Sequence, residues 1–473
     1  MEMNPKVNDA AEHGDLEQTM TGAPSQPGDV QNVQMSDDVF GEVGEDGPNY
    51  RNVGWIAAAV LMLKSQIGIG VLSIPTAFDV LGMIPGIICL LFIASVATWS
   101  GFIVGPFKLR HPSVYGLDDA GMMIAGPIAR EMMAGGFTLY WIFLSGSGML
   151  GVSIGLNALS THGACTAIFV AVAAAIGFIF ASVRTLGRLS WLAWVGTACV
   201  LVSVFVLTVA AGVQERPAAA PQTGPWESNW KIAANPTFEE AMAAVSSLVL
   251  AYAGVPAFFA VASEMADPKL YTRSVLSCQL VATVTYSIIG IVVYYYCGSF
   301  VASPALGSAG VLMKKVCYGL VLPGLIVSTL LYIHLTAKYF MVRILRGSKH
   351  LAANTWQHWT TWLCCTGGIT IIAYCIASGI PVFESLVSLV GALFGTFMTF
   401  QPMGAMWFYD NWNKVERDWK WKLRVCWAAF VIVIGTFLMI GGTYGSVVGI
   451  IDSYSAEGGG SGAWSCADNS NSV

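Results

Sequence analysis

The chain has 473 residues, of which 55% are hydrophobic and only 11% are charged. Soluble domains carry about one quarter charged residues, so this composition excludes an ordinary soluble protein and predicts an all-α protein that crosses the membrane many times. Residues 1–50 set the formal net charge of −5, because they hold eleven acidic residues and one lysine; subtracting these from the totals of 28 and 23 leaves 17 acidic and 22 basic residues.

Residues 1–50 also contain Gly, Pro and Ser and almost no aromatic residues. This composition predicts a disordered, acidic, cytosolic tail. No cleavable signal peptide precedes Gly54, so we expect the first span to act as its own targeting signal. The eleven cysteines are scattered, mostly in apolar segments, and none forms a Cys-x-x-Cys pair. We therefore expect packing roles for them, with no metal site and no disulfide framework.

Eleven apolar segments are close to the roughly 20 residues that cross a bilayer. They cover 54–78, 82–105, 136–160, 164–183, 189–213, 237–263, 275–302, 315–343, 361–379, 382–408 and 424–446. The polar residues 115–131 are expected along the inner membrane surface. Residues 303–311 are either a mobile lid or an ordinary loop. The predicted transmembrane domain is 51–446, followed by a flexible tail, 447–473.

Basic residues separate the two sides of the membrane. Alternate loops carry fifteen of them: Lys108, Arg110, Arg130, Arg184, Arg188, Lys269, Arg273, Arg343, Arg346, Lys349, Lys414, Arg417, Lys420, Lys422 and Arg424. The other loops carry Arg216 and Lys231, with Lys314 and Lys315 at a boundary. Since basic loops stay in the cytosol, the sequence predicts a cytosolic N-terminus and an extracellular C-terminus.

Two spans are interrupted by glycine and proline. Ile67–Pro75 interrupts the first span, and Tyr252–Pro256 interrupts the sixth. A break in a membrane helix is tolerated where it faces protein or a water-filled cavity. Two interrupted helices at matching positions of two halves indicate a secondary-transporter binding site. The alternative is that both breaks only kink their helices, because Gly and Pro are common in membrane helices.

The spans divide into five, five and one. An odd number of crossings separates the two interrupted spans, so the halves 54–213 and 237–408 have inverted topology, with 424–446 as an extra helix. This is the 5+5 inverted repeat of the leucine-transporter architecture.

Two motifs resemble those of a known family. Residues 68–75 are similar to the Gly-x-Gly-x-Leu-x-x-Pro signature of the amino acid/auxin permease family. Residues 251–256, followed by Glu264–Pro268, resemble that family's sixth-helix pattern. The resemblance covers residues 51 to about 445 and is strongest to fungal neutral amino acid permeases of the methyltryptophan-resistance type. It implies amino acid transport and favours the plasma membrane.

The breaks could bind an amino acid zwitterion through the backbone. The half-helix that begins near Val71 offers the N–H groups of Ile69 and Gly70 to a carboxylate, and glycine permits close approach of the ligand. In the pattern of this architecture, unwound carbonyls accept from the ammonium. The predicted substrate-binding residues are Gln66, Gly68, Ile69, Gly70, Tyr252, Ala253, Gly254, Val255, Phe258 and Phe259.

Within this set, Tyr252, Phe258 and Phe259 would shape an apolar pocket, although aromatic residues in a span more often serve packing. No spare buried acid or arginine lies near the breaks in the sequence. The sequence therefore predicts a substrate with a neutral side chain.

Lys64 lies near the middle of the first span, where an ionisable residue suggests function. Aligned on the glycines, it falls where sodium-coupled relatives offer a backbone ligand to a cation, so its ammonium could replace that sodium. His334, which titrates near neutrality, and Thr336 lie at comparable depth in span eight. The alternatives are a structural Lys64 that caps the broken helix and a His334 that only packs. Lys338 is expected to snorkel toward the cytosol.

Glu264 ends the sixth span and is predicted to form an inner gate with Lys269 or Arg273. The alternative is a solvated helix end.

The sequence predicts a proton-coupled symporter of neutral, aliphatic or aromatic amino acids that works by alternating access in the plasma membrane. It needs no cofactor beyond the proton gradient and no metal, and its partners are the amino acid and the lipid bilayer, not nucleic acid. Open alternatives are a sodium-coupled carrier, a receptor-like permease that signals through residues 1–50, and a vacuolar location. An enzyme is not expected, because the sequence has no clustered catalytic residues.

Overall fold

The computed structural model describes residues 52–183, 186–351, 353–380, 382–413, 417–455 and 464–470, without the side chains of 186–189 and 453–455. The predicted acidic tail, residues 1–50, lies outside these ranges. The described chain is helical, apart from loops and one isolated β-bridge between Val53 and Met265.

Fifteen α-helices occur in the described ranges. They are α1 (Trp55–Gln66), α2 (Ile74–Leu81), α3 (Met83–Arg110), α4 (Leu117–Ser160), α5 (Thr166–Ala181), α6 (Leu186–Val213), α7 (Phe238–Tyr252), α8 (Val255–Glu264), α9 (Tyr271–Cys297), α10 (Val311–Leu345), α11 (Trp356–Gly379), α12 (Phe383–Leu389), α13 (Thr396–Thr399), α14 (Gln401–Asn411) and α15 (Trp419–Ser455). Short 3₁₀ turns precede α2, α9 and α10, and a π-helical stretch, Val390–Gly395, joins α12 to α13.

Nine stretches of the described chain are long and apolar enough to cross a membrane, and α1 with α2, bent by 44°, makes a tenth. α5 is apolar but has only 16 residues. The structure therefore confirms an all-α, multi-span protein. It does not confirm the predicted count of eleven spans.

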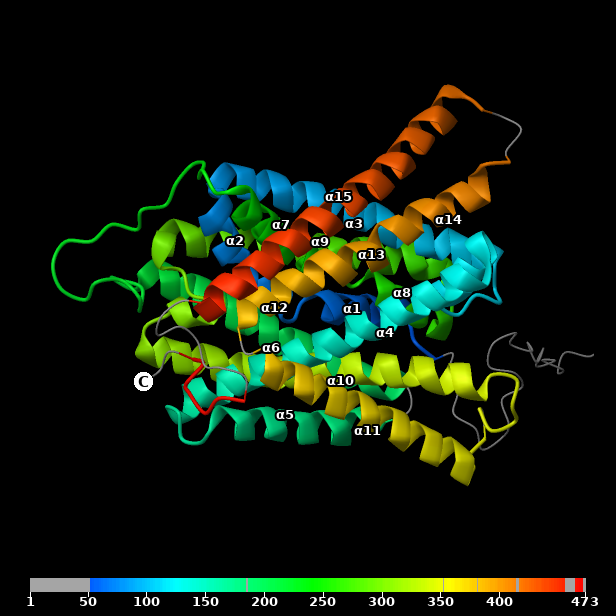
Figure 1. Cartoon of the computed structure of the whole chain (residues 1–473), viewed down its shortest axis with the longest axis horizontal. Coiled ribbons are helices and arrows are strands. Elements are labelled where there is room, and N and C mark those ends of the chain that lie inside the picture. Colours follow the sequence, from blue (N-terminus) through cyan, green and yellow to red (C-terminus); the bar gives the residue numbers. More distant parts are fainter. Residues whose placement is uncertain are drawn as a thin grey trace, which may run out of the picture. The chain divides into compact units, whose positions relative to one another are not determined.

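The α7–α8 pair lies at the centre and α15 lies at the edge. In the most apolar 18-residue stretch of Phe238–Glu264, 94% is buried, whereas in the corresponding stretch of α15 only 22% is buried. α10 packs on α4, α5, α6 and α11, while α15 packs on α7, α12 and α14 (Figure 1). α1 is enclosed by α6, α8 and α9. The interrupted helices are therefore covered by protein, as a break in a membrane helix requires.

The segment predicted to lie on the inner surface forms the first turns of α4. The helix kinks at Ala125 and Gly126 before it continues to Ser160. Gly126 has φ +81°, a conformation that glycine adopts without the steric penalty of a side chain. The kink separates the polar turns from the long apolar part.

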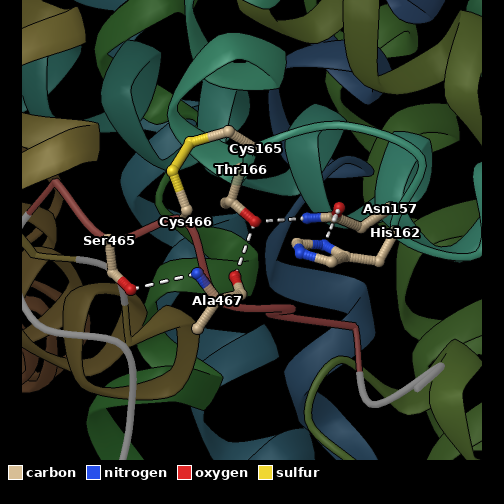
Figure 2. The surroundings of a disulfide bond; sticks show 7 residues. All are labelled: Asn157, His162, Cys165, Thr166, Ser465, Cys466 and Ala467. Atoms are coloured by element: carbon tan, nitrogen blue, oxygen red, sulfur yellow. Dashed lines mark hydrogen bonds between the residues drawn. A yellow bond between two sulfur atoms is a disulfide. The ribbon is translucent and has the colours of Figure 1, made fainter.

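A disulfide joins Cys165, at the start of α5, to Cys466 near the C-terminus (Figure 2). Around it, Thr166 Oγ1 donates to the carbonyl of Ala467 at 2.6 Å and accepts from Asn157 Nδ2 at 2.8 Å. The prediction that the cysteines form no disulfide was wrong, because the two cysteines are 301 residues apart and a spacing rule detects only nearby pairs.

The predicted flexible tail also needs correction. α15 runs to Ser455, nine residues beyond the predicted end at 446, and residues 464–470 are bound to the helices. Asn469 Nδ2 donates to Ser153 Oγ at 3.1 Å, and Lys314 Nζ donates to the Ser470 carbonyl at 2.5 Å. We call this end of the bundle the disulfide face (Cys165, Cys466, Lys314), and the end where α1 begins the basic face (Arg110, Arg343, Arg346).

Candidate functional site

The first break lies between α1 and α2. α1 ends at Gln66, and Ile67 is extended, with φ −77° and ψ 93°. A 3₁₀ turn, Gly70–Ser73, follows, and Pro75 lies in the first turn of α2. Proline suits that position because the N–H groups in the first turn of a helix have no acceptor within the helix, so the absence of one costs no hydrogen bond. The local sequence therefore ends one helix and starts the next.

The second break lies between α7 and α8. α7 ends at Tyr252. Ala253 and Gly254 form a turn between the two helices, and Pro256 lies in the first turn of α8. Both interruptions that the sequence predicts are present.

The two breaks lie against each other. A Cβ atom on Gly70 would be 2.7 Å from Ala251 Cα, and one on Gly254 would be 2.5 Å from Gln66 Cγ. Real Cβ atoms do not approach other heavy atoms so closely. Each glycine therefore allows the backbone of one break to touch the other.

Polar side chains hold the carbonyls of the second break. Tyr286 Oη donates to the Ala251 carbonyl at 2.8 Å, and Gln66 Nε2 donates to the Tyr252 carbonyl at 3.4 Å. Tyr140 Oη of α4 donates to the Ala253 carbonyl. The unwound carbonyls that we expect to accept from a substrate ammonium are those of Gln66, Tyr252, Ala253 and Val255, and two of them, Tyr252 and Ala253, accept from Gln66 and Tyr140. Tyr140 is not predictable from the sequence, because no motif marks it.

The first break contains buried amide groups that make no hydrogen bond in the described part of the chain. Within the described residues, no hydrogen bond outside the helices uses the N–H of Gly68, Ile69 or Gly70. Gly68 faces α10, where a Cβ would be 2.9 Å from Ser328 Oγ and 3.0 Å from Tyr332 Oη. The break therefore offers both unbonded backbone donors and nearby hydroxyl groups.

The predicted aromatic residues point in different directions. The Tyr252 ring is edge-on to Tyr286, with centroids 5.0 Å apart, and its hydroxyl donates to Thr283 Oγ1 at 3.1 Å. The Phe258 ring lies beside Gly101 of α3. Phe259 and Val255 are also buried. Of these side chains, Tyr252 is the one whose contacts lie beside the carbonyls of the second break.

Lys64 lies at the end of α1, fully buried. Its Nζ donates to the Ile67 carbonyl at 3.2 Å. Gly196 of α6 leaves room for the side chain, because a Cβ there would be 3.2 Å from Lys64 Cε. A cation at this position complements the negative end of the α1 dipole. The Lys64 side chain therefore lies between the first break and α6.

His334 lies elsewhere in the bundle. Its Nδ1 is 3.4 Å from the Ala181 carbonyl of α5, and its ring is 5.2 Å from the Trp362 ring of α11. Thr336 Oγ1 donates to the Tyr332 carbonyl of its own helix at 2.9 Å. Lys64 and His334 thus contact different helices, and the structure does not bring these predicted coupling residues together.

Glu264 forms a buried ion pair with Lys338 of α10 at the basic face. Both side chains are at most 1% exposed. The predicted partners, Lys269 and Arg273, were wrong, because the buried Glu264 carboxylate pairs with Lys338 of α10 and not with a base in the loop that follows α8. The expectation that Lys338 snorkels is also wrong. Nearby, the Val53 N–H donates to the Glu264 carbonyl at 3.1 Å, which ties the chain before α1 to the end of α8.

Further ion pairs surround this buried one. Arg343 of α10 binds both oxygens of Glu131 at 2.5 and 2.7 Å, and Arg346 binds Asp119 at 2.8 and 3.0 Å. Lys108 Nζ donates to Ser263 Oγ at 2.6 Å. The described residues contain no group of three or more His, Cys, Asp or Glu side chains able to hold a metal.

Solved transporters share this fold. A Na⁺-coupled sialic acid symporter, in a substrate-bound outward-open state, has a TM-score of 0.53 and 13% identity over 88% of this chain and 93% of that chain. A nucleobase-cation-symport-1 family transporter, closed with bromovinylhydantoin bound, has a TM-score of 0.51 and 13% identity over 86% and 94%. At this identity the likeness shows the fold alone, that of the leucine-transporter type.

Curated proteins are similar over most of the chain. A transmembrane transporter of Gibberella moniliformis is 35% identical over 93% of this chain and 92% of that protein. An N amino acid transport system protein of Neurospora crassa is 30% identical over 87% and 88%. The model of the family described as transmembrane amino acid transporter protein matches residues 51–448. The chain is thus a multi-pass secondary transporter of amino acids, and it belongs to the transmembrane amino acid transporter family.

Proposed function

We propose that the protein is a proton-coupled symporter of neutral amino acids that works by alternating access. The observation that carries this proposal is the contact between the two breaks, with Gly70 against Ala251 and Gly254 against Gln66. An amino acid carries an anionic and a cationic end in a fixed arrangement. Two facing breaks supply backbone N–H donors for one end and carbonyl acceptors for the other.

In this proposal the substrate carboxylate accepts from the N–H groups of Gly68, Ile69 and Gly70. The ammonium takes the carbonyls of Tyr252 and Ala253 and displaces Gln66 Nε2 and the Tyr140 hydroxyl from them. These two side chains satisfy the carbonyls when no substrate is bound, which lowers the cost of an empty site in a membrane, where an unpaired polar group is expensive.

The charge distribution supports a neutral substrate side chain. The buried Lys, Asp and Glu side chains of the described residues include Lys64, Asp118, Glu264, Lys314, Lys338 and Asp410, which pairs with Arg110 at the basic face. Glu264 pairs with Lys338 at the basic face, Asp118 begins α4 at that face, and Lys314 binds the tail at the disulfide face. Lys64 is the buried formal charge beside the breaks, and it is bonded to Ile67. A cationic side chain would find no opposite charge there.

Lys64 is the proposed coupling residue. Its ammonium bonds the Ile67 carbonyl, and its side chain packs against Gly196 of α6, so it lies between the first break and α6. Loss of its proton would weaken this bond, because a neutral amine is a poorer donor than an ammonium, and would remove the charge that complements the α1 terminus. Proton binding at Lys64 would therefore favour the conformation in which the first break is held in place.

Uptake in vesicles tests the coupling. With purified protein in proteoliposomes, an inward proton gradient is expected to drive accumulation of radiolabelled neutral amino acids without sodium. Competition by cationic and acidic amino acids should be weak. Accumulation that requires sodium, or that is unchanged when the proton gradient is collapsed, would reject the proposal.

A Lys64→Met variant separates coupling from binding. We expect it to lose gradient-driven accumulation while it still exchanges internal for external substrate, because exchange needs the site but not net proton movement. Lys314→Met is the matched control, since it removes another buried lysine far from the breaks. A Lys64→Met protein that accumulates substrate as well as the wild type would contradict the role.

The orientation follows from two independent features. The loops of the basic face carry most of the basic residues, which favours the cytosolic side. The opposite face carries the Cys165–Cys466 disulfide, and disulfides persist outside the cytosol. Both support a cytosolic N-terminus and a C-terminus on the opposite, non-cytosolic side, which is the extracellular side in the proposed plasma-membrane location.

Thiol labelling of intact cells checks this orientation. A membrane-impermeant maleimide is expected to label Cys165 in a Cys466→Ser variant without reduction, and in the wild type only after reduction. Peptide mapping assigns the labelled cysteine. If Cys165 of the variant reacts only after the membrane is permeabilised, the proposed orientation is inverted.

A further inference from the structure

A groove of about 740 Å³ opens between α3, α14 and α15 at the basic face, away from the two breaks. Figure 1 shows α14 and α15 diverging toward the segment that joins them. Charged residues lie at its mouth: Arg110 ends α3, Asp410 lies near the end of α14, and Arg424 is in the second turn of α15. Aromatic residues line its inner part.

The mouth carries a net positive charge, from two arginines against one aspartate. Arg110 Nη1 is 2.6 Å from one oxygen of Asp410, and His111 Nε2 is 2.8 Å from the other. The carboxylate is therefore fully used by its own neighbours. Arg424 is exposed and has no acidic partner among the described residues. Its guanidinium can bind an anion that reaches the mouth.

The groove extends into the apolar part of the bundle. Trp99 lies eleven residues before Arg110 on α3, about 16 Å deeper at the helical rise, which is about half of a 30 Å hydrocarbon core. Its ring is edge-on to Trp427 of α15, with centroids 6.4 Å apart. Phe102 and Leu423, which also line the groove, are 41% and 57% exposed. The groove thus combines a cationic mouth with an apolar wall one leaflet deep.

We propose that this groove binds one anionic phospholipid. The headgroup phosphate accepts from the Arg424 guanidinium, which suits phosphate oxygens because it donates two parallel hydrogen bonds. The net positive charge of the mouth favours a headgroup with a net negative charge over a zwitterionic one. An acyl chain lies along Phe102 and Trp427 toward Trp99. A small soluble anion would use the mouth but not the apolar depth. The site is separate from the substrate pathway, and its occupancy does not depend on how transport is coupled.

Native mass spectrometry of the purified full-length protein tests the site. After incubation with mixed phosphatidylserine and phosphatidylcholine, the wild type is expected to retain one phosphatidylserine in preference to phosphatidylcholine. Arg424→Gln should lower this retention about tenfold, as expected for loss of a charged hydrogen bond. Lys422→Gln is the matched control, because it removes a neighbouring exposed charge that does not line the groove, and it should retain the lipid.

A second variant tests the apolar part without a change of charge. Leu423→Trp places a large ring in the groove and should also prevent retention of phosphatidylserine. Thermal stability in lipid-free detergent should stay at the wild-type value. Equal loss in Lys422→Gln and Arg424→Gln, no preference for the anionic lipid, or full displacement by inorganic phosphate would each overturn the proposal. None of these measurements uses transport, so they stay valid if the proposed coupling is wrong.

Discussion

Gly70→Leu is expected to abolish amino acid uptake while the protein still reaches the membrane. Any Cβ at this position would lie 2.7 Å from Ala251 Cα and 3.0 Å from Ala251 N. These are backbone atoms, so rotation of a side chain cannot relieve the clash. The two breaks must separate, and the N–H groups of one then no longer face the carbonyls of the other. Forcing extra atoms into a packed interior costs about 1–3 kcal/mol even where side chains can adjust.

Smaller substitutions give a ranked series that a general folding defect would not produce. Gly70→Ala should reduce the rate of uptake about tenfold or more, on the same scale of strain. Gly254→Ala should be milder, because its closest neighbours, Gln66 Cγ and Ser65 Oγ, belong to side chains that can move. Gly151→Ala is the control, since its Cβ would lie 3.6 Å from Leu325 Cδ1, an ordinary contact.

Initial rates of radiolabelled uptake, normalised to surface-labelled protein, measure the series. A Gly70→Ala protein that transports at the wild-type rate would show that the breaks do not need to touch. Loss of all three variants from the surface would show a folding defect instead of a defect in the site.

Local sequence was sufficient to predict the two breaks. Glycine and proline determine the conformation of their own backbone, so the positions of the helix ends follow from the residue types. The residues concerned are Gly68, Gly70 and Pro75 in the first break and Gly254 and Pro256 in the second. The membrane adds a strong constraint, because an interrupted helix must be enclosed by protein. The family motifs lie on these same residues, which is why fold and family were both recognisable from the sequence.

Contacts between distant residues were not predictable in the same way. The separations are 74 residues for Glu264 and Lys338, 113 for Tyr140 and the Ala253 carbonyl, and 301 for the disulfide. Each depends on the depth at which two helices meet, and depth depends on helix tilt, which packing sets. From the sequence alone, the nearby bases Lys269 and Arg273 are the expected partners of Glu264, because local sequence does not encode the depth at which α8 meets α10.

Single neutral substitutions in the Glu264–Lys338 pair are expected to damage the protein more than the double substitution. Lys338→Met leaves the Glu264 carboxylate buried without its cation, which typically costs about 3–5 kcal/mol. Glu264→Gln leaves the ammonium buried in the same way. The double variant buries neither charge, and replacement of a buried pair by neutral groups is often tolerated. Surface expression and thermal stability in detergent should therefore recover in the double variant.

Arg343→Gln provides the matched control. Arg343 binds Glu131, whose side chain is 63% exposed, and exposed pairs contribute only about 0–1 kcal/mol. Its removal should leave expression and stability close to the wild type. A double variant that is no more stable than either single variant would show that the two charges do not depend on each other.

The double variant also tests whether the pair is a gate. The pair joins the end of α8 to α10 at the basic face, so its removal should favour the conformation that is open there. Cys278 is a native probe, because it is buried and its Sγ donates to Gln66 Oε1 beside the first break at 3.7 Å. Its reaction with a small thiol reagent applied from the basic face should be about tenfold faster in the double variant, the effect expected for loss of one charged hydrogen bond. Recovered stability with unchanged Cys278 reactivity would make the pair a structural contact and would remove Glu264 from the gate. Faster reactivity with weaker accumulation would connect the pair to alternating access, because a carrier that stays open on one side cannot hold a gradient.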